Sequence, residues 1–202
     1  MAFIDHDARE LNLKIVYCGP GLAGKTTNLR HIHHATPPER RSAMTSRASE
    51  VERMLFFSLA SPSLPPLRGL AVRLHLYTVP GAAAHGTSHE LVLTNVDGVV
   101  FVADSQRTRA AANLDALEDL EIDLAARGRD LRELPLVMQY NKRDLPQLLS
   151  VAELDVLLGA AECPRLEAVA TNGVGVLATL EALAEAILAP LRDDAGGPAS
   201  AS

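Results

Sequence analysis

The chain lacks long apolar runs, has little cysteine and carries no excess of positive charge. No apolar run is long enough to span a membrane, and the N-terminal residues lack the apolar segment of a secretory signal, so we expect a soluble cytoplasmic protein. The formal net charge of −6 argues against nucleic acid as a bulk electrostatic partner. Tryptophan is absent and aromatic residues make up 3% of the chain, an imbalance from which no function is inferred.

The two cysteines are too distant in sequence to suggest a metal site. Cys18 and Cys163 form no pair at metal-ligand spacing. Cys18 ends an apolar run, so we expect a buried thiol in a reducing compartment.

The remaining composition is that of one globular domain. The 202 residues are 48% hydrophobic and 22% charged, which suffices for an α/β fold with a sizeable core. We expect one domain over residues 1–192, followed by a disordered Ala/Gly/Ser-rich tail over residues 193–202.

Strand-like and helix-like segments alternate along the chain. The predicted strands, read from apolar and β-branched runs, are Leu13–Cys18, Met54–Leu59, Ala71–Thr78, Gly98–Asp104, Leu134–Tyr140 and Leu166–Ala170. The predicted helices are one that ends before Pro37, then Ala110–Arg127, Val151–Leu158 and Gly175–Leu191. Residues 2–12 could extend the first strand or lie along it. This alternation predicts a mostly parallel sheet with helices on both faces.

Two segments are predicted to be loops of functional length. The polar stretch from Glu39 to Glu52 follows the first helix, and the small, polar stretch from Ala82 to His89 follows a Pro-Gly turn. Long loops in compact domains are usually functional or disordered.

Residues Gly19 to Thr26 have the P-loop pattern, a glycine, four residues and then Gly-Lys-Thr. Backbone N–H groups of such a loop turn toward phosphate oxygens, and the following helix points its positive end at them. Lys25 supplies a charge to the β and γ phosphates, and the Thr26 hydroxyl can hold Mg²⁺. The expected phosphate-binding residues are Gly19, Gly21, Leu22, Ala23, Gly24, Lys25, Thr26, Thr27 and Gly81.

A second polar motif, Asn141-Lys142-Arg143-Asp144, directly follows a predicted strand. The Asp144 carboxylate can accept hydrogen bonds from the N1–H and 2-amino groups of guanine, a donor pair that adenine lacks. Asn141 can bridge the base and the P-loop, and the stem of Lys142 can lie along the ring. The two motifs together predict a site for GTP or GDP with Mg²⁺, and disfavour an ATP-using kinase.

Three histidines, His31, His33 and His34, cluster near the end of the first helix. They could bind a metal, but no carboxylate or thiol stands at ligand spacing, so solvated imidazoles are favoured.

With these motifs the chain resembles the Ras-like small GTPases, and most closely the bacterial MglA family of cell-polarity GTPases. The matching stretches are residues 19–29, 55–57, 74–81, 97–105 and 140–146. Thr78, in the Thr-Val-Pro-Gly turn, stands where ordinary Ras-like proteins have Asp and the MglA family has Thr. The resemblance implies a Ras-like G domain, a polarity or motility role at the cell pole, and an MglB-like Roadblock-domain activator with polarity effectors as partners. It also implies that the Ala170 N–H lies near guanine O6.

Two residues depart from the family pattern. Ala82 stands where the family has the glutamine that positions the attacking water, and Met54 replaces a switch threonine that binds Mg²⁺ and the γ-phosphate. Arg53 matches the family's intrinsic catalytic arginine, with an ordinary solvated side chain as the alternative. The expected protein is therefore a switch with slow GTP hydrolysis, and the alternative is a pseudo-GTPase that acts through protein contacts.

Overall fold

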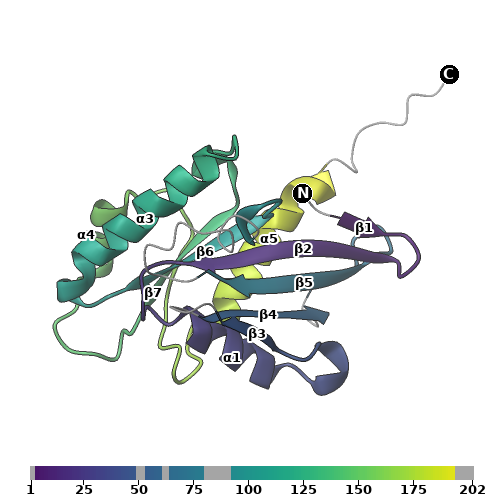
Figure 1. The fold of residues 1–202 in the computed structure, drawn as a ribbon, viewed down its shortest axis with the longest axis horizontal. Coiled ribbons are helices and arrows are strands. Elements are labelled where there is room, and N and C mark those ends of the chain that lie inside the picture. The colour runs from purple at the N-terminus through teal and green to yellow at the C-terminus, as the bar shows by residue number, and fades with distance from the viewer. Residues whose placement is uncertain (1–2, 49–52, 61–63, 80–91, 194–202) are drawn as a thin grey trace.

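The computed structural model describes residues 3–48, 53–60, 64–79 and 92–193. Its centre is an eight-stranded sheet in the order β3-β4-β5-β2-β6-β7-β8, with β1 paired to β2 (Figure 1). The strands are β1 (Phe3–Asp5), β2 (Glu10–Cys18), β3 (Thr45–Ala48), β4 (Arg53–Ala60), β5 (Ala71–Thr78), β6 (Gly98–Asp104), β7 (Leu136–Asn141) and β8 (Arg165–Glu167). The α-helices are α1 (Lys25–Ala35), α3 (Ala110–Ala125), α4 (Val151–Leu158) and α5 (Val176–Asp193).

Five neighbouring strands, β5, β2, β6, β7 and β8, are parallel, which confirms the predicted sheet type. Strand β2 lies between β5 and β6, and Ile15 faces Leu76 on one side and Gly98 on the other. Every residue of β6 is buried, as an apolar run in the middle of a parallel sheet predicts. The carboxyl ends of these strands therefore meet at one edge, where open α/β sheets bind ligands.

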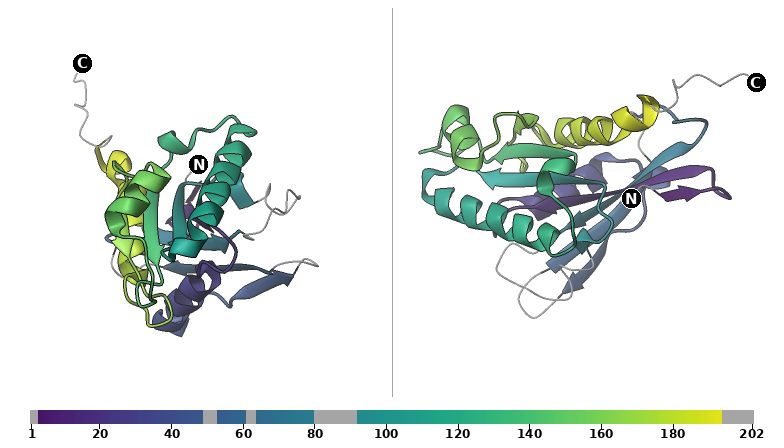
Figure 2. Two further views of the ribbon diagram at one scale, coloured as in Figure 1. Left: turned by 90° about the vertical axis from the view of Figure 1, so that its left-hand side faces the viewer. Right: turned by 90° about the horizontal axis from the view of Figure 1, so that it is seen from above.

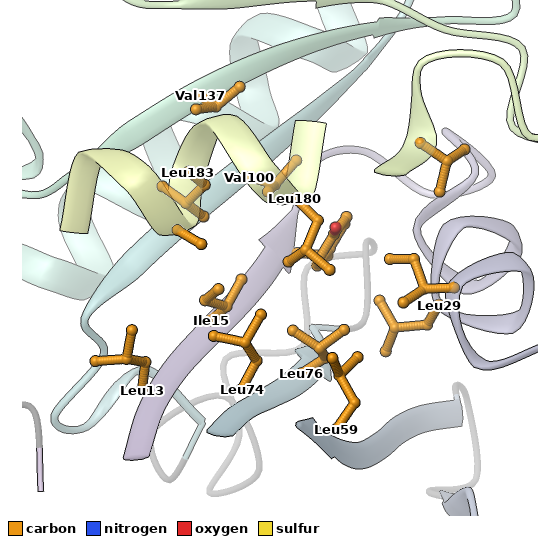
Figure 3. Packing of buried hydrophobic residues seen from close by; sticks show 14 of the residues in the cluster. Leu13, Ile15, Leu29, Leu59, Leu74, Leu76, Val100, Val137, Leu180 and Leu183 are labelled. Atoms are coloured by element: carbon orange, nitrogen blue, oxygen red, sulfur yellow. The ribbon is translucent and has the colours of Figure 1, made fainter. Parts of the chain in front are cut away.

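Two hydrophobic clusters cover the two faces of the sheet. One joins the sheet to α1 and α5 and includes Leu29, Leu76 and Leu183 (Figure 3). The other joins it to α3 and α4 and includes Phe101 and Leu124. Figure 2 shows α5 and α3 on opposite sides of the strands. Helices on both faces of one sheet confirm the predicted architecture.

Two parts of the sheet are antiparallel: strands β3 and β4 at the edge beyond β5, and the short β1 beside the start of β2. Strand β1 pairs with the start of β2, which begins at Glu10, so the N-terminal segment both lengthens the first strand and lies along it. The predicted loop from Glu39 to Glu52 is wrong in part, because Thr45–Ala48 forms edge strand β3 opposite β4. Four polar or small residues carry no alternating apolar pattern, and their partner strand supplies the order.

The observed helix boundaries agree with the boundaries predicted from the sequence to within a few residues. Helix α4 begins after Ser150, whose hydroxyl accepts from the Glu153 N–H in a capping box. The leucines at helical spacing in α3 are only partly buried, since Leu120 and Leu124 are in the core but Leu114 is 40% exposed. Helix α5 extends to Asp193, and the proposed tail beyond it lies outside the described residues.

Among the described residues, no helix has the length and apolarity needed to cross a membrane.

Candidate functional site

The predicted site residues gather at the carboxyl edge of the parallel strands. Asp104 and Asn141 are the last residues of β6 and β7, and the loops that follow β2 and β8 contribute Gly19 and Ala170. Loops at this edge are joined to strands buried in the core, so their starting points are fixed. The sequence motifs at residues 19–26 and 141–144 are thereby brought together.

The phosphate loop depends on glycine at two positions. Gly19 has φ 126° and Gly24 has φ 108°, both in the left-handed half of the map. A Cβ atom at Gly19 would lie 2.2 Å from the Val102 carbonyl oxygen, and one at Gly24 would lie 2.2 Å from Asn141 Nδ2. Both positions therefore require a residue without a side chain.

Lys25 begins α1 and points back under the same loop. Its Nζ donates to the carbonyl oxygens of Gly19 at 2.7 Å and Pro20 at 2.8 Å, and the residue is only 7% exposed. The ammonium is thus held against the inner side of the loop, as the sequence pattern predicts for a phosphate-binding lysine. Thr26 and Thr27 follow it in the first turn of α1.

Leu22 is unusual among the loop residues. It has φ 66° and is 89% exposed, although a left-handed conformation costs a branched residue about 1–2 kcal/mol. Strained backbone of this kind persists where the surroundings impose it, as at ligand-binding loops.

Asn141 joins the phosphate loop to the loop after β8. Its Nδ2 donates to the Ala23 carbonyl at 2.7 Å, and its Oδ1 accepts the Ala170 N–H at 2.9 Å. The predicted bridge from Asn141 to the P-loop is therefore present. The Ala170 N–H, which the resemblance places near guanine O6, is bonded to Asn141 here.

A pocket of about 270 Å³ opens between these loops. Its lining residues are Leu22, Gly24, Thr27, Asn141, Lys142, Asp144, Leu145, Ala170 and Thr171. Asp144 is exposed at the rim of this pocket. The Lys142 Nζ donates to Asp104 Oδ2 at 2.7 Å. A carboxylate beside an apolar-walled pocket is what the predicted guanine-binding loop requires.

Two further residues at this site, Asp104 and Arg109, were not predicted from the sequence. Asp104 is buried at the end of β6, and Arg109 Nη2 donates to the Gly21 carbonyl at 2.8 Å. A carboxylate that ends an entirely apolar strand was the available signal for Asp104. Arg109 carries no local signal, because it reaches the phosphate loop from 88 residues away.

The residues expected near the γ-phosphate are only partly described. Met54 lies in β4, half buried, and packs against the second hydrophobic cluster. Thr78 is 1% exposed and its Oγ1 accepts the Leu55 N–H at 2.9 Å, so its hydroxyl links β5 to β4. Arg53 begins β4 opposite Ala48, and its side chain lies outside the described part of the chain.

Gly81 and Ala82 fall in residues 80–91, outside the described residues. The phosphate contact predicted for Gly81 and the departure at Ala82 therefore rest on the sequence.

The histidine cluster is not a uniform solvated group. His33 Nε2 lies 3.1 Å from the Ser42 carbonyl oxygen, and its ring packs edge-on against Phe57 at 4.9 Å. Arg41 also contacts His33 through its ring and its carbonyl oxygen. The expectation of a solvated His33 is wrong, because the segment after α1 folds back over it. Within the described ranges, no group of three metal-ligand side chains is assembled.

Cys18 is a buried thiol, as predicted. Burial raises its pKa to about 12, so the reactive thiolate is not formed near neutral pH.

Comparison with known proteins identifies the family. A sequence model of the ADP-ribosylation factor (Arf) family matches residues 3–187. The mutual gliding-motility protein MglA of Myxococcus xanthus (strain DK1622) is 49% identical over 192 residues, covering 95% of this chain and 98% of that protein. The chain belongs to the MglA family of Ras-like small GTPases.

More distant relatives of this MglA-family chain match over about half its length. The ADP-ribosylation factor-like protein 4D of Homo sapiens is 32% identical over 109 residues, 50% of this chain and 51% of that protein. The Bos taurus protein of the same name is 33% identical over 100 residues, 46% of this chain and 47% of that protein. Small GTPases as a family bind guanine nucleotide and Mg²⁺.

The residues present fit such a ligand. A Cβ atom at Gly24 would meet the Asn141 side chain, so only glycine fits there, and the Lys25 Nζ bonds to the carbonyls of the same loop. Mg²⁺ prefers oxygen ligands, keeps several waters and is often bound through nucleotide phosphates. The Thr26 hydroxyl, in the first turn of α1, is an oxygen group of the kind that Mg²⁺ prefers.

Proposed function

We propose that this chain is a guanine-nucleotide-dependent switch of the MglA type that hydrolyses GTP slowly. The observation that carries the proposal is the pair of hydrogen bonds from Asn141 to Ala23 and Ala170, which joins the phosphate loop to the guanine-side pocket. The phosphate-binding residues named from the P-loop pattern, and Asn141, Lys142, Asp144 and Ala170 on the base side, make up the proposed binding site. Thr26 is the proposed protein ligand of Mg²⁺.

Slow hydrolysis follows from the two departures. Phosphoryl transfer depends on positioning and charge stabilisation, and Ala82 has no side-chain group to orient water. Losing one preorganised contact costs about 3 kcal/mol, or about a hundredfold in rate. Met54 packs on the sheet and has a thioether, which is a poor partner for a hard cation. Arg53 is the remaining candidate catalytic residue.

A role in cell polarity or motility is proposed from the likeness to the gliding-motility protein MglA. The same likeness supports an MglB-like Roadblock-domain activator as the partner, and location at the cell pole. The two predicted loops, each extended by one residue to about Glu39–Arg53 and Ala82–Glu90, would then be switch segments that order differently with GTP and GDP.

A pseudo-GTPase is the second candidate. The observation that favours it is Met54, which stands where the family has a Mg²⁺-binding threonine and packs against the second hydrophobic cluster. Such a protein would hold nucleotide constitutively or weakly, and would act through protein contacts.

Hydrolysis separates the two candidates. The purified protein is first denatured and its bound nucleotide identified; we expect GDP or GTP. Phosphate release from GTP is then followed for the wild type, for Ala82→Gln, and for Ala82→Gln combined with Met54→Thr. The first change restores a water-positioning group and should raise the rate about a hundredfold, with a further gain for the double variant.

Ala83→Gln is the matched control, since it places the same side chain one position later. It should leave the rate within about twofold of the wild type, well below the gain of a catalytic contact. A wild type as fast as Ala82→Gln contradicts slow hydrolysis, and a protein with no measurable GTP affinity favours the pseudo-GTPase. Repeating the assay with a Roadblock-domain protein tests the proposed activator.

A further inference from the structure

A buried carboxylate lies between the phosphate loop and the guanine-side loop. The Asp104 side chain is 1% exposed, and its Oδ1 accepts the Gln106 N–H at 3.1 Å. Asn113 of α3 fixes its backbone, because Oδ1 of Asn113 accepts the Asp104 N–H and Nδ2 of Asn113 donates to the Asp104 carbonyl, each at 2.9 Å. The position of this carboxylate is therefore set by the core.

Two cations from different loops approach the same oxygen of Asp104. The Lys142 Nζ is 2.7 Å from Oδ2, and the Arg109 Nε is 3.7 Å from it. A buried carboxylate is costly unless it is paired, so each cation is held where it compensates the charge. Lys142 belongs to the proposed guanine-binding motif.

Arg109 also reaches the phosphate loop. Its Nη2 donates to the Gly21 carbonyl at 2.8 Å, while the Nε of the same planar group faces Asp104. An arginine can serve both positions at once because its nitrogens form a rigid fork; the single ammonium of a lysine cannot. The side chain is 35% exposed, so it is not part of the hydrophobic core.

We propose that Arg109 is a positioning residue that ties the phosphate loop to the guanine-binding loop through the buried Asp104 carboxylate. The inference rests on the proposed function, since it concerns how the same site holds its nucleotide. The order of contacts is Gly21 carbonyl, Arg109, Asp104 and Lys142. Occupation of either loop is thereby coupled to the position of the other.

The test is the dissociation rate of a fluorescent GDP analogue, chased with unlabelled GDP. Arg109→Lys keeps the charge but not the fork, and should release the nucleotide about tenfold faster, as expected for losing a charged hydrogen bond. Arg107→Lys is the matched control. Arg107 lies two residues away, has a side chain that is 58% exposed and pairs with Glu153 of α4. The GDP dissociation rate of Arg107→Lys should therefore stay within about twofold of the wild type.

The tie itself is tested by a double-mutant cycle with Lys142→Met, which keeps the stem and removes the ammonium. If Arg109 and Lys142 act through one carboxylate, their effects on the dissociation rate should be non-additive by at least about threefold. The urea midpoint of the nucleotide-free protein is measured in parallel. Because Arg109 bonds Gly21 within the protein itself, Arg109→Lys should lower this midpoint by no more than one lost hydrogen bond. Only a positioning role also predicts the faster, non-additive release of GDP.

Each contrary outcome has a distinct meaning. A wild type that binds no guanine nucleotide overturns the proposed function and this inference with it. A wild type that binds, with Arg109→Lys releasing GDP no faster than Arg107→Lys, overturns the inference alone. Additive effects of the Arg109 and Lys142 variants on the dissociation rate also overturn it.

Discussion

Gly24 combines a left-handed backbone with a close neighbour, so the phosphate loop should not tolerate a side chain at this position. A Cβ atom added there would lie 2.2 Å from Asn141 Nδ2 and would displace this amide, which donates to the Ala23 carbonyl. Gly24→Ala should therefore cost about 1–2 kcal/mol in backbone strain and a further 1–3 kcal/mol, about the value of a lost buried hydrogen bond. Urea unfolding measures the loss, and GDP affinity should fall at least about tenfold because the loop is displaced.

Gly128→Ala separates the cost of backbone strain from the cost of a steric clash. Gly128 has φ 68°, and a Cβ atom there would meet nothing within 4 Å. We expect only the strain cost, about 1–2 kcal/mol, and unchanged GDP affinity. Equal losses for the two variants would show that the approach of Asn141 to Gly24 is unimportant.

Single residues were predictable where their chemistry is local. The spacing of Gly19, Gly24 and Lys25 predicts a phosphate loop, and the structure has the backbone conformations that it requires. The link from Arg109 to Gly21 could not be predicted, since nothing in the sequence brings together residues 88 positions apart. His33 illustrates the same limit, because its burial depends on how the segment after α1 folds back.

At the scale of elements, α1, β7 and α5 are joined by buried amides and a hydroxyl. Asn28 and Gln139 exchange two hydrogen bonds, of 2.8 and 3.0 Å, and the Gln139 Nε2 also donates to Thr179 Oγ1 at 2.9 Å. All three residues are 0% exposed. Since Asn28 also donates to the Gly24 carbonyl, the group supports the phosphate loop from below.

Removing two members of this group should cost less than the sum of the two single changes. Gln139→Leu leaves the Asn28 amide buried without that partner, which should cost about 1–3 kcal/mol of unfolding free energy. Adding Asn28→Leu removes the unsatisfied amide, so the double variant should lose less than the two single variants together. Thr179 keeps its bond to the Gly175 carbonyl, which avoids a second unsatisfied group.

Urea unfolding of the four proteins gives this coupling energy. Simple additivity would show that the amide pair acts only through its separate members.

Element types followed from the sequence, whereas this polar group did not. The apolar runs of β6 and β7 are visible as buried strands, but Gln139 interrupts one of them without indicating its partners. Strand β3 was missed because its order comes from pairing with β4, not from its own four residues.

At the scale of the whole molecule, the parallel strands place loops from distant parts of the sequence along one edge. The alternation of apolar runs and helical patterns predicts this arrangement, and the observed order β5-β2-β6-β7-β8 confirms it. The flanking antiparallel strands depend on turns that carry weak local signals. The strands that end at this edge belong to the two hydrophobic clusters, so a ligand bound there should stabilise the entire fold against unfolding.

Nucleotide binding should therefore raise the unfolding temperature of the whole chain. At a ligand concentration about 100 times Kd the gain is about 2.7 kcal/mol, which corresponds to about 5–10 °C for a domain of this size. We expect this shift with GDP and little shift with ADP at equal concentration, since Asp144 offers acceptors that match guanine donors. Thermal unfolding followed by circular dichroism measures both.

Asp144→Asn should remove most of the GDP shift, because a charged acceptor of two hydrogen bonds is lost at the base. Asp115→Asn is the matched control, as Asp115 lies exposed on α3 and is not among the pocket residues. If ADP stabilises the wild type as much as GDP does, or if Asp144→Asn keeps the full preference for GDP, the pocket does not select guanine through this carboxylate. In that case the phosphate loop alone would set the affinity, and both purines would be held with similar strength.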